Sequence, residues 1–302
     1  MKRNPYELQR SVQSLAASGQ LDRAIDLLEK TVENDSSYME AWMLLGSIFR
    51  SIGKLDMAIE VCKKSLEHIP NNSTIWVNLG HLYIENNQHD QAMEPLKKAL
   101  SIDSRNPSAW YSLGMASMAK EEYSQAINAF QKTIKLDPTR FNAWLNLASS
   151  LDDMKKYKEA IKTYKNALEL QPSSFNAWIG LGMVYVNNGD ISKAIEAYQK
   201  GLKIDPNVAS AWFHLGTTLS KANKLDKAID AIKTGLGIDS TIAQAWFDLK
   251  DVYEKKGDKE GEIWALKKAI ATGKIDIEFT NSTDPEEIMK MIDKWNEKNK
   301  NK

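Results

Sequence analysis

Apolar and polar positions follow one another along this chain in a pattern that repeats every 34 residues. Within each period, apolar side chains recur at spacings of three and four residues in two successive stretches. A short polar segment, such as residues 187–190, separates the two stretches. Spacings of three and four place side chains on one face of a helix. The pattern therefore predicts two amphipathic helices per period, joined by a turn.

Tryptophan marks this period most clearly. A tryptophan taken as position 4 of each unit gives units that begin at residue 39. A fixed period of this length indicates a solenoid of stacked units, rather than the two ordinary domains that 302 residues would otherwise suggest. Seven of the nine tryptophans follow the period without a slip: Trp42, Trp76, Trp110, Trp144, Trp178, Trp212 and Trp246.

Other positions keep the same period. Position 7 is Leu in all seven units, position 8 is Gly in five, position 20 is Ala in six and position 32 is Pro in four. Small residues at positions 8 and 20 allow the two helices of a unit to approach closely, with large side chains at positions 4 and 24 around them. Proline at position 32 ends the second helix and starts the next unit.

The combination Trp-x2-Leu-Gly-x2-Tyr, Ala-x3-Phe/Tyr and Pro resembles the signature of the tetratricopeptide repeat. The unit with Trp178, Tyr185, Ala194, Tyr198 and Pro206 carries it almost completely. The resemblance implies an all-α fold, a right-handed α-solenoid superhelix of about eight 34-residue helix-turn-helix repeats.

The resemblance covers residues 39–276 strongly and 5–38 more weakly, because Leu8 stands where tryptophan is expected. We expect the solenoid to occupy residues 1–276. It comprises a degenerate repeat at 5–38 and repeats at 39–72, 73–106, 107–140, 141–174, 175–208, 209–242 and 243–276.

Residues 277–302 follow the last repeat as a linker, a helix and a frayed tail. Asp284 and Pro285 are typical of a helix start. We expect a C-terminal capping helix over the last repeat, or alternatively a detachable helix that folds back or captures a partner. Its apolar face comprises Ile288, Met291, Ile292 and Trp295.

Two residues depart from the pattern inside the second helices of their units. Pro95, at position 23, removes a backbone donor, so we expect a kink there. Cys62, at position 24, stands where the repeat usually has Phe or Tyr, and we interpret it as a core residue of low reactivity.

Charge and composition exclude several classes of function. The chain has 40 basic and 40 acidic residues, and this balance argues against binding to nucleic acid or to an anionic membrane. The N-terminus lacks the apolar run of a secretory signal, and no uncharged apolar stretch approaches about 18 residues. We therefore expect a cytoplasmic protein that does not insert into a membrane.

Candidate catalytic chemistry is sparse. The four histidines, His68, His81, His89 and His214, fall at unrelated repeat positions and form no metal-binding pair. No glycine-rich phosphate motif is present, and no nucleophile, base and orienting residue form a set. We expect no metal, no cofactor and no enzymatic activity.

Family resemblance implies that the first helix of each repeat lines a concave face, with positions 2, 5, 6, 9, 12 and 13 pointing into it. Methionine is an adaptable contact residue, and asparagine can bond both backbone groups of an extended peptide. These features predict a peptide-binding groove across the second to sixth units. The alternative is a generic, partly apolar inner surface, because position 5 packs partly against the next helix. The candidate residues are Asn78, Tyr111, Met115, Asn142, Leu145, Asn146, Asn176, Ile179, Met183, Phe213, His214 and Phe247.

The leading hypothesis is a non-enzymatic adaptor that binds an extended segment of a partner protein. The carboxylate clamp of chaperone-binding repeats is excluded, because no unit has a basic residue at position 5 or Asn at position 9. The asparagines are partly similar to those of O-linked N-acetylglucosamine transferase repeats. Two alternatives stay open. One is an assembly platform that self-associates through its C-terminal end, where Trp264 and Trp295 lie. The other is a regulatory subunit of a transferase or of a secretion or chaperone complex.

Overall fold

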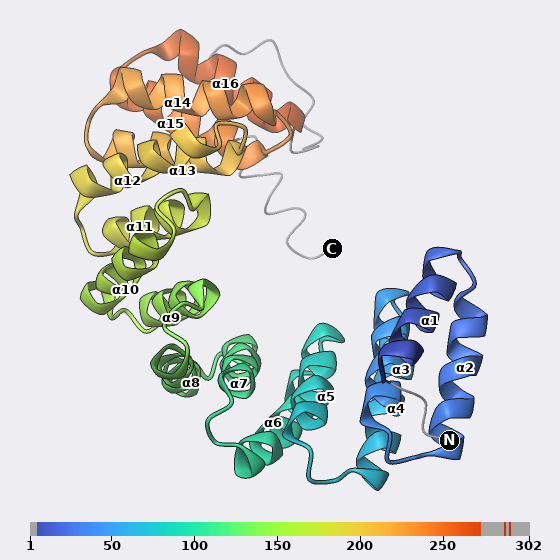
Figure 1. Cartoon of the computed structure of the whole chain (residues 1–302). Coiled ribbons are helices and arrows are strands. Elements are labelled where there is room, and N and C mark those ends of the chain that lie inside the picture. Colours follow the sequence, from blue (N-terminus) through green and yellow to red (C-terminus); the bar gives the residue numbers. More distant parts are fainter. Residues whose placement is uncertain (1–4, 273–286, 288–289, 291–302) are drawn as a thin grey trace. The chain divides into compact units, whose positions relative to one another are not determined.

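The computed structural model describes residues 5–272, 287 and 290, and these form helices joined by short turns (Figure 1). The chain divides into two compact units, Met1–Met154 and Lys155–Lys302. We call the odd-numbered helices A helices and the even-numbered ones B helices. Both sets begin every 34 residues, as the sequence period predicts. The all-α solenoid of helix pairs is therefore confirmed, while the handedness of the superhelix stays a prediction.

The first unit contains nine helices among its described residues, and each helix packs against its neighbours in sequence. They are α1 (Pro5–Ala17), α2 (Leu21–Asn34), α3 (Met39–Ser51), α4 (Leu55–His68), α5 (Ser73–Glu85), α6 (His89–Ile102), α7 (Pro107–Ala119), α8 (Tyr123–Leu136) and α9 (Phe141–Asp153).

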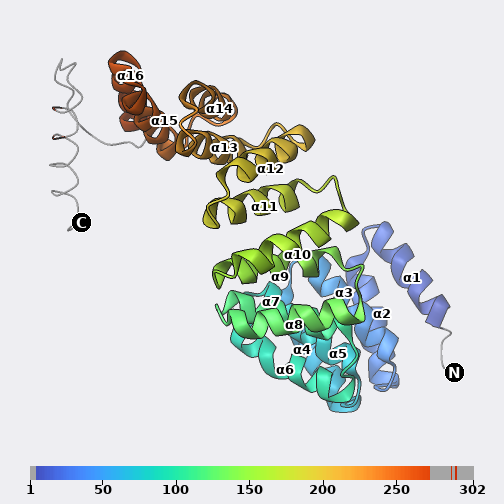
Figure 2. The ribbon, with the colours of Figure 1, turned by 90° about the vertical axis from the view of Figure 1, so that its left-hand side faces the viewer.

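The second unit contains seven helices in its described part, and A and B helices alternate within it (Figure 2). They are α10 (Tyr157–Leu170), α11 (Phe175–Asn187), α12 (Ile191–Ile204), α13 (Ala209–Lys221), α14 (Leu225–Ile238), α15 (Ala243–Lys256) and α16 (Lys259–Thr272).

Small residues permit the close approach of A and B helices, as the sequence suggests. A Cβ atom added to Gly114 of α7 would lie 2.6 Å from the ring of Phe130 on α8. The same close fit joins Gly182 to Tyr198, where the distance is also 2.6 Å. Each of these contacts places a position-24 side chain directly against a position-8 glycine. A larger residue at position 8 would have to displace that side chain.

Each tryptophan of the period donates a hydrogen bond that the sequence pattern does not reveal. The indole N–H of Trp178 lies 2.9 Å from the backbone carbonyl oxygen of Pro172, six residues earlier. Since Pro172 lies in the turn between α10 and α11, the bond ties the turn after one repeat to the first helix of the next. The same bond is made by Trp42, Trp76, Trp110, Trp144, Trp212 and Trp246.

The turn between an A helix and the following B helix requires a left-handed residue at position 15. Gly189 meets this requirement with φ 84°, a conformation that costs glycine little. Glu121 adopts φ 59° at the equivalent place, where a side chain makes the conformation strained. Of the eight equivalent turns, four have glycine and four do not.

The expected kink at Pro95 and the expected capping helix are not tested by the described structure. Helix α6 continues through Pro95, which is buried within it, and the kink there stays a prediction. The proposed capping helix, with Asp284 and Pro285 at its start, lies outside the described residues. Among the helices that are described, none has the length and apolar character needed to cross a membrane.

Replacement of Trp178 by Phe tests the indole hydrogen bond. Trp178→Phe keeps an aromatic ring but removes the donor to the Pro172 carbonyl, so we expect the free energy of unfolding to fall by about 1 kcal/mol. Urea unfolding followed by circular dichroism measures the change. Trp264→Phe is the matched control, because the indole of Trp264 makes no hydrogen bond within the described residues. An equal loss in both variants would show that ring size, and not the hydrogen bond, matters.

Two glycine-to-alanine substitutions test the fit between positions 8 and 24. Gly114→Ala forces the Phe130 ring to move, so we expect destabilisation of about 1–3 kcal/mol. Gly46→Ala meets nothing closer than 3.8 Å and gains helix propensity, so we expect no loss and up to about 1 kcal/mol of stabilisation. The comparison of both urea midpoints checks this expectation. A Gly46→Ala protein as unstable as Gly114→Ala would contradict it.

Candidate functional site

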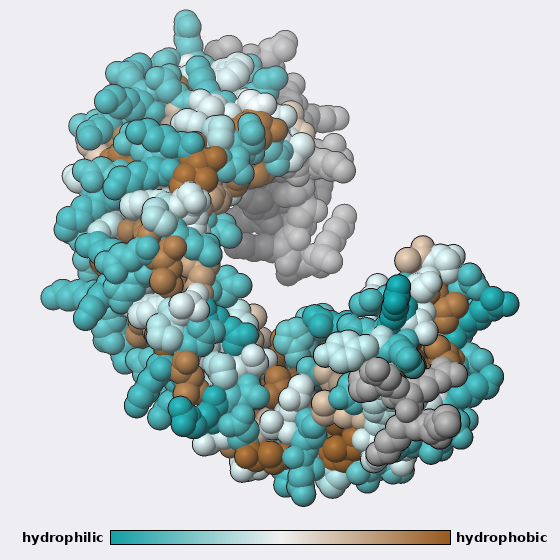
Figure 3. All heavy atoms as spheres, viewed as in Figure 1, coloured by the Kyte–Doolittle hydropathy of each residue, from teal (hydrophilic) through white to brown (hydrophobic). Residues whose placement is uncertain are grey.

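The A-helix face comprises the side chains at positions 2, 5, 6, 9, 12 and 13 of the A helices. On the side of the molecule shown in Figure 3, hydrophobic side chains appear as separate brown patches among hydrophilic ones in each unit. Asn142, Asn176 and Met183 are exposed, and Met183 is unusual for a methionine with 43% of its surface accessible. The half-buried candidates are Asn78, Tyr111, Met115, Leu145, Asn146, Ile179, His214 and Phe247.

Phe213 offers the least surface of the candidate residues. Only 9% of it is accessible, and its ring lies 2.5 Å from the place where a Cβ of Gly235 would stand. It therefore packs between α13 and α14 more than it faces solvent. This burial agrees with the expectation that position 5 is shared between core and surface.

In the first unit, asparagine amides link neighbouring A helices. The amide nitrogen of Asn146 on α9 donates to the Tyr111 hydroxyl of α7 at 3.1 Å and to the Met115 sulfur at 3.0 Å. Asn78 of α5 donates in the same way to the Met43 sulfur of α3 at 3.1 Å. A thioether sulfur is a weak acceptor. Asn78 thus has a weak acceptor, and Asn146 has one weak acceptor beside an ordinary hydroxyl.

Arg140 joins the cluster around Tyr111 and was not predicted from the sequence. Its guanidinium carbon lies 4.9 Å from the centre of the Tyr111 ring, and one nitrogen donates to the Ser108 hydroxyl at 3.2 Å. Burial raises the pKa of Tyr111, which stays a neutral donor and acceptor at physiological pH. The sequence did contain a sign of this role at position 34. Two earlier repeats have the helix-capping residues Asn72 and Asn106 there, whereas this repeat has Arg140.

A pocket of about 210 Å³ lies between α3 and α5 in the first unit. Arg50 and Glu85 form an ion pair beside it, with 2.7 Å between Nε and Oε2. His81 lies 3.6 Å from the same carboxylate, yet burial lowers its pKa below the ordinary value. The lining residues are Trp42, Met43, Gly46, Ser47, Arg50, Cys62, Asn78, His81 and Leu82.

A second pocket, of about 180 Å³, lies between α11 and α13 at the equivalent place of the second unit. His214 stacks on Tyr198 there, with ring centres 5.9 Å apart and planes 17° apart. Burial lowers the pKa of His214 and raises that of the nearby Asp248 carboxyl. The lining residues are Met183, Val186, Asn187, Tyr198, His214, Thr217, Thr218 and Lys221.

The C-terminal end of the described chain carries the exposed Trp264. It packs edge-on against Trp246, with ring centres 5.2 Å apart, and the Lys233 ammonium lies 5.5 Å from its ring centre. These contacts account for the place of Trp264 within its own unit. Its role in self-association, together with that of Trp295 outside the described residues, stays a prediction.

Within the described parts of the chain, no group of three or more His, Cys, Asp or Glu side chains is placed to hold a metal ion. Burial raises the pKa of the Cys62 thiol to about 11, so the thiol is protonated at neutral pH. The arrangement thus offers pockets, amides and aromatic rings, which suit binding.

Helix pairs with a period of 34 residues and an amide-bearing A-helix face define an α-solenoid repeat protein. Family models match parts of the chain: the cytochrome c-type biogenesis protein H TPR domain at residues 102–204, the tetratricopeptide repeat protein 21 C-terminal ARM domain at 6–140, and a tetratricopeptide repeat at 197–230. Among curated proteins, none matches this chain significantly.

Solved structures extend the comparison. A crystal structure of MamA is 30% identical, with 54% of this chain and 95% of that chain covered and a TM-score of 0.52. YrrB is 24% identical, covering 62% of this chain and 96% of that chain, with a TM-score of 0.55. A repeat protein from Cytophaga hutchinsonii is 19% identical, covering 82% and 97%, with a TM-score of 0.64. The chain belongs to the tetratricopeptide repeat family, and the fold supports a role in protein–protein interaction.

The half-buried histidines make stability depend on pH. Burial holds the pKa of His81 and His214 below the unfolded value of 6.5, although Glu85 and Asp248 partly oppose it. The unfolded chain therefore binds more protons once the pH falls below 6.5, and the free energy of unfolding decreases. We expect the urea midpoint to drop between about pH 7 and pH 5. His81→Gln/His214→Gln should flatten this drop, and an unchanged slope in that variant would refute the assignment.

Proposed function

We propose that this protein is a non-enzymatic adaptor whose A-helix faces bind an extended segment of a partner protein. The observation that carries the proposal is the set of amide-to-sulfur hydrogen bonds made by Asn78 and Asn146. Each amide is oriented at the surface, and each has a weak acceptor that a better one can replace.

An extended peptide supplies such a better acceptor. Its backbone carbonyl oxygens are stronger acceptors than the thioether sulfurs of Met43 and Met115, and its N–H groups can donate to an asparagine side-chain oxygen. Displacement of a weak bond by a stronger one adds to the free energy of binding without exposing an unpaired amide. The asparagines would therefore recognise backbone, which every peptide has.

Methionines beside the amides supply adaptable apolar contact. Met183 leaves 43% of its surface accessible, and Met115 is half-buried next to Asn146. A flexible, polarizable side chain can adjust to side chains of different shape. Backbone recognition by amides, together with adjustable methionine contacts, suits partner segments of varied sequence.

The comparisons support this class of function. Tetratricopeptide repeat proteins are in general interaction modules without catalytic activity. YrrB, which shares the fold, is described as having an unusual peptide-binding site. The partner proposed here is a protein segment, with neither nucleic acid nor a membrane as ligand.

Peptides selected from a random dodecamer display library on the wild-type chain provide the test. Asn146→Ala should weaken binding of peptides that use the first unit about 5–10-fold, because one hydrogen bond is lost. Met183→Glu places a charge in an apolar contact and should weaken peptides that use the second unit by a similar factor or more. Isothermal titration calorimetry measures both changes.

Lys162→Ala, on the exposed surface of α10, is the control and should bind as the wild type does. All variants must match the wild type in helicity and melting temperature before comparison. If the selected peptides bind wild type, Asn146→Ala and Met183→Glu equally, the A-helix face is not the binding surface.

A further inference from the structure

One glycine at position 8 differs from the other four because no side chain lies close above it. A Cβ added to Gly46 would meet nothing closer than Val61 at 3.8 Å, an ordinary van der Waals distance. At the equivalent glycines, a position-24 side chain lies within 2.6 Å of the added atom. Gly46 therefore leaves room for an added methyl group where other repeats are filled. The covered glycines are Gly80, Gly114, Gly182 and Gly216.

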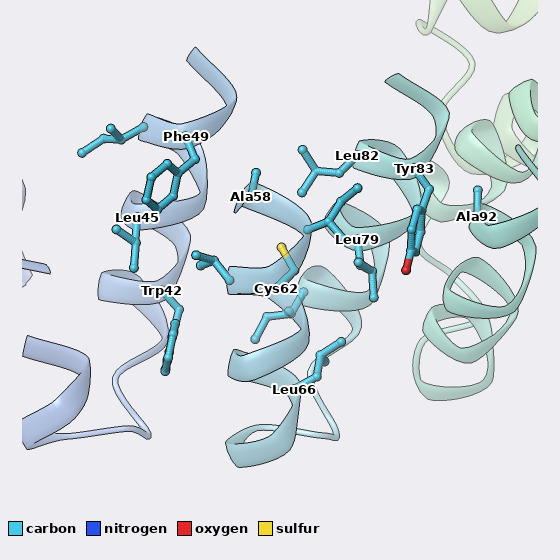
Figure 4. Close-up of a cluster of buried hydrophobic side chains, with 14 of the residues drawn as sticks. Trp42, Leu45, Phe49, Ala58, Cys62, Leu66, Leu79, Leu82, Tyr83 and Ala92 are labelled. Atoms are coloured by element: carbon cyan, nitrogen blue, oxygen red, sulfur yellow. The ribbon is translucent and has the colours of Figure 1, made fainter. Parts of the chain in front are cut away.

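The cause is Cys62, which occupies position 24 on α4. Its side chain is smaller than every other residue at this position and does not reach Gly46. Figure 4 shows Cys62 between the side chains contributed by α3, such as Trp42 and Leu45, and those of α5, such as Leu79. The other position-24 residues are Leu28, Leu96, Phe130, Tyr164, Tyr198, Ile232 and Leu266.

The space above Gly46 belongs to the pocket between α3 and α5, because Gly46 and Cys62 both line that pocket. The buried side chains of Trp42 and Leu82 line it too, together with Met43. The volume of about 210 Å³ exceeds the roughly 150 Å³ of an apolar cavity that can hold a benzene molecule. One Leu, Met or Phe side chain therefore fits.

The charges around the pocket favour an uncharged occupant. Arg50 and Glu85 neutralise one another through their ion pair at the rim. Burial lowers the pKa of His81 and raises that of Cys62, so both are neutral at pH 7. A charged side chain would lose its hydration in this pocket and find no partner of opposite charge that is free.

The equivalent pocket of the second unit has a large side chain at position 24. Tyr198 occupies position 24 there, and its ring lies over Gly182. Thr217, Thr218 and Lys221 make the lining more polar. The two pockets thus share a place in the repeat but differ in chemistry, and of the two only the first is lined by its position-8 glycine.

We propose that the pocket above Gly46 and Cys62 binds one large uncharged apolar side chain, such as Leu, Met or Phe, of an extended partner segment. This proposal rests on the proposed function and adds a side-chain preference to it. Asn78 lies at the rim, where its amide can exchange the Met43 sulfur for the backbone of the same segment.

Cys62→Leu tests the pocket by filling it. Leucine occupies this position in α6 and α16, so the variant should keep its fold and melt at the same or a higher temperature than wild type. The test uses dodecamers selected on wild type that compete with a peptide whose binding is weakened by Asn78→Ala. Cys62→Leu should bind these dodecamers about ten-fold or more weakly than wild type does, because leucine excludes their apolar side chain from the pocket. Cys62→Ser, which keeps the space open, is the matched control and should stay within about three-fold of wild type.

The peptide supplies the complementary test. Each Leu, Met and Phe of a selected dodecamer is replaced in turn by Ala. One of these replacements should lower the affinity for wild type about ten-fold, but should change the affinity for Cys62→Leu little. The bound dodecamer should also slow the reaction of Cys62, the only cysteine, with N-ethylmaleimide.

Outcomes separate this proposal from the proposed function. If Cys62→Leu binds every selected dodecamer as wild type does, while Asn146→Ala and Met183→Glu do not, the pocket is not an anchor site and the adaptor function stands. If wild type selects no dodecamer at all, both proposals are wrong.

Discussion

The indole hydrogen bond from each tryptophan to the carbonyl six residues earlier is the interaction on which the architecture depends. It holds the turn that follows a B helix against the first turn of the next A helix, in seven successive places. Since the bond is 2.8–3.0 Å long in every case, the junction between repeats has one geometry throughout. The free energy it contributes belongs to the junction and not to either repeat.

Within a repeat, the side chain at position 24 decides how much space is left above the glycine at position 8. Where a ring or branched side chain covers glycine, as Phe130 covers Gly114, it fills that space. Where Cys62 stands, the space is left, and Gly46 and Cys62 both line a pocket. A solenoid can therefore gain room for a side chain of a partner through one small core residue, without any change of its helices. The buried residue at position 24 thus helps to determine which surface the repeat presents.

Periodicity in the sequence was sufficient to predict the helices, their spacing and the close contacts of glycine, because these depend on residues a few positions apart. The bond from Trp178 to Pro172 escaped prediction, since the acceptor is a backbone carbonyl that any residue possesses. The cluster of Arg140 with Tyr111 was missed because it joins residues 29 positions apart through the packing of two A helices. Cys62 was recognised as a core residue, but its consequence appears only when the space left by the missing side chain is measured.

The left-handed turn residue has a consequence for the motion of the chain. Because stability in a repeat array is local, a strained turn lowers the cost of opening its own helix pair more than that of distant ones. Glu121, between α7 and α8, carries this strain in the middle of the first unit, whereas Gly53, between α3 and α4, does not. Local opening is thus expected to be distributed unevenly along the array. The α3–α4 hairpin, which contributes Gly46 and Cys62 to the pocket, turns at a glycine, whereas the α5–α6 hairpin on its other side turns at Asn87 with φ 55°. A segment bound between them would contact one hairpin that opens less readily than the other.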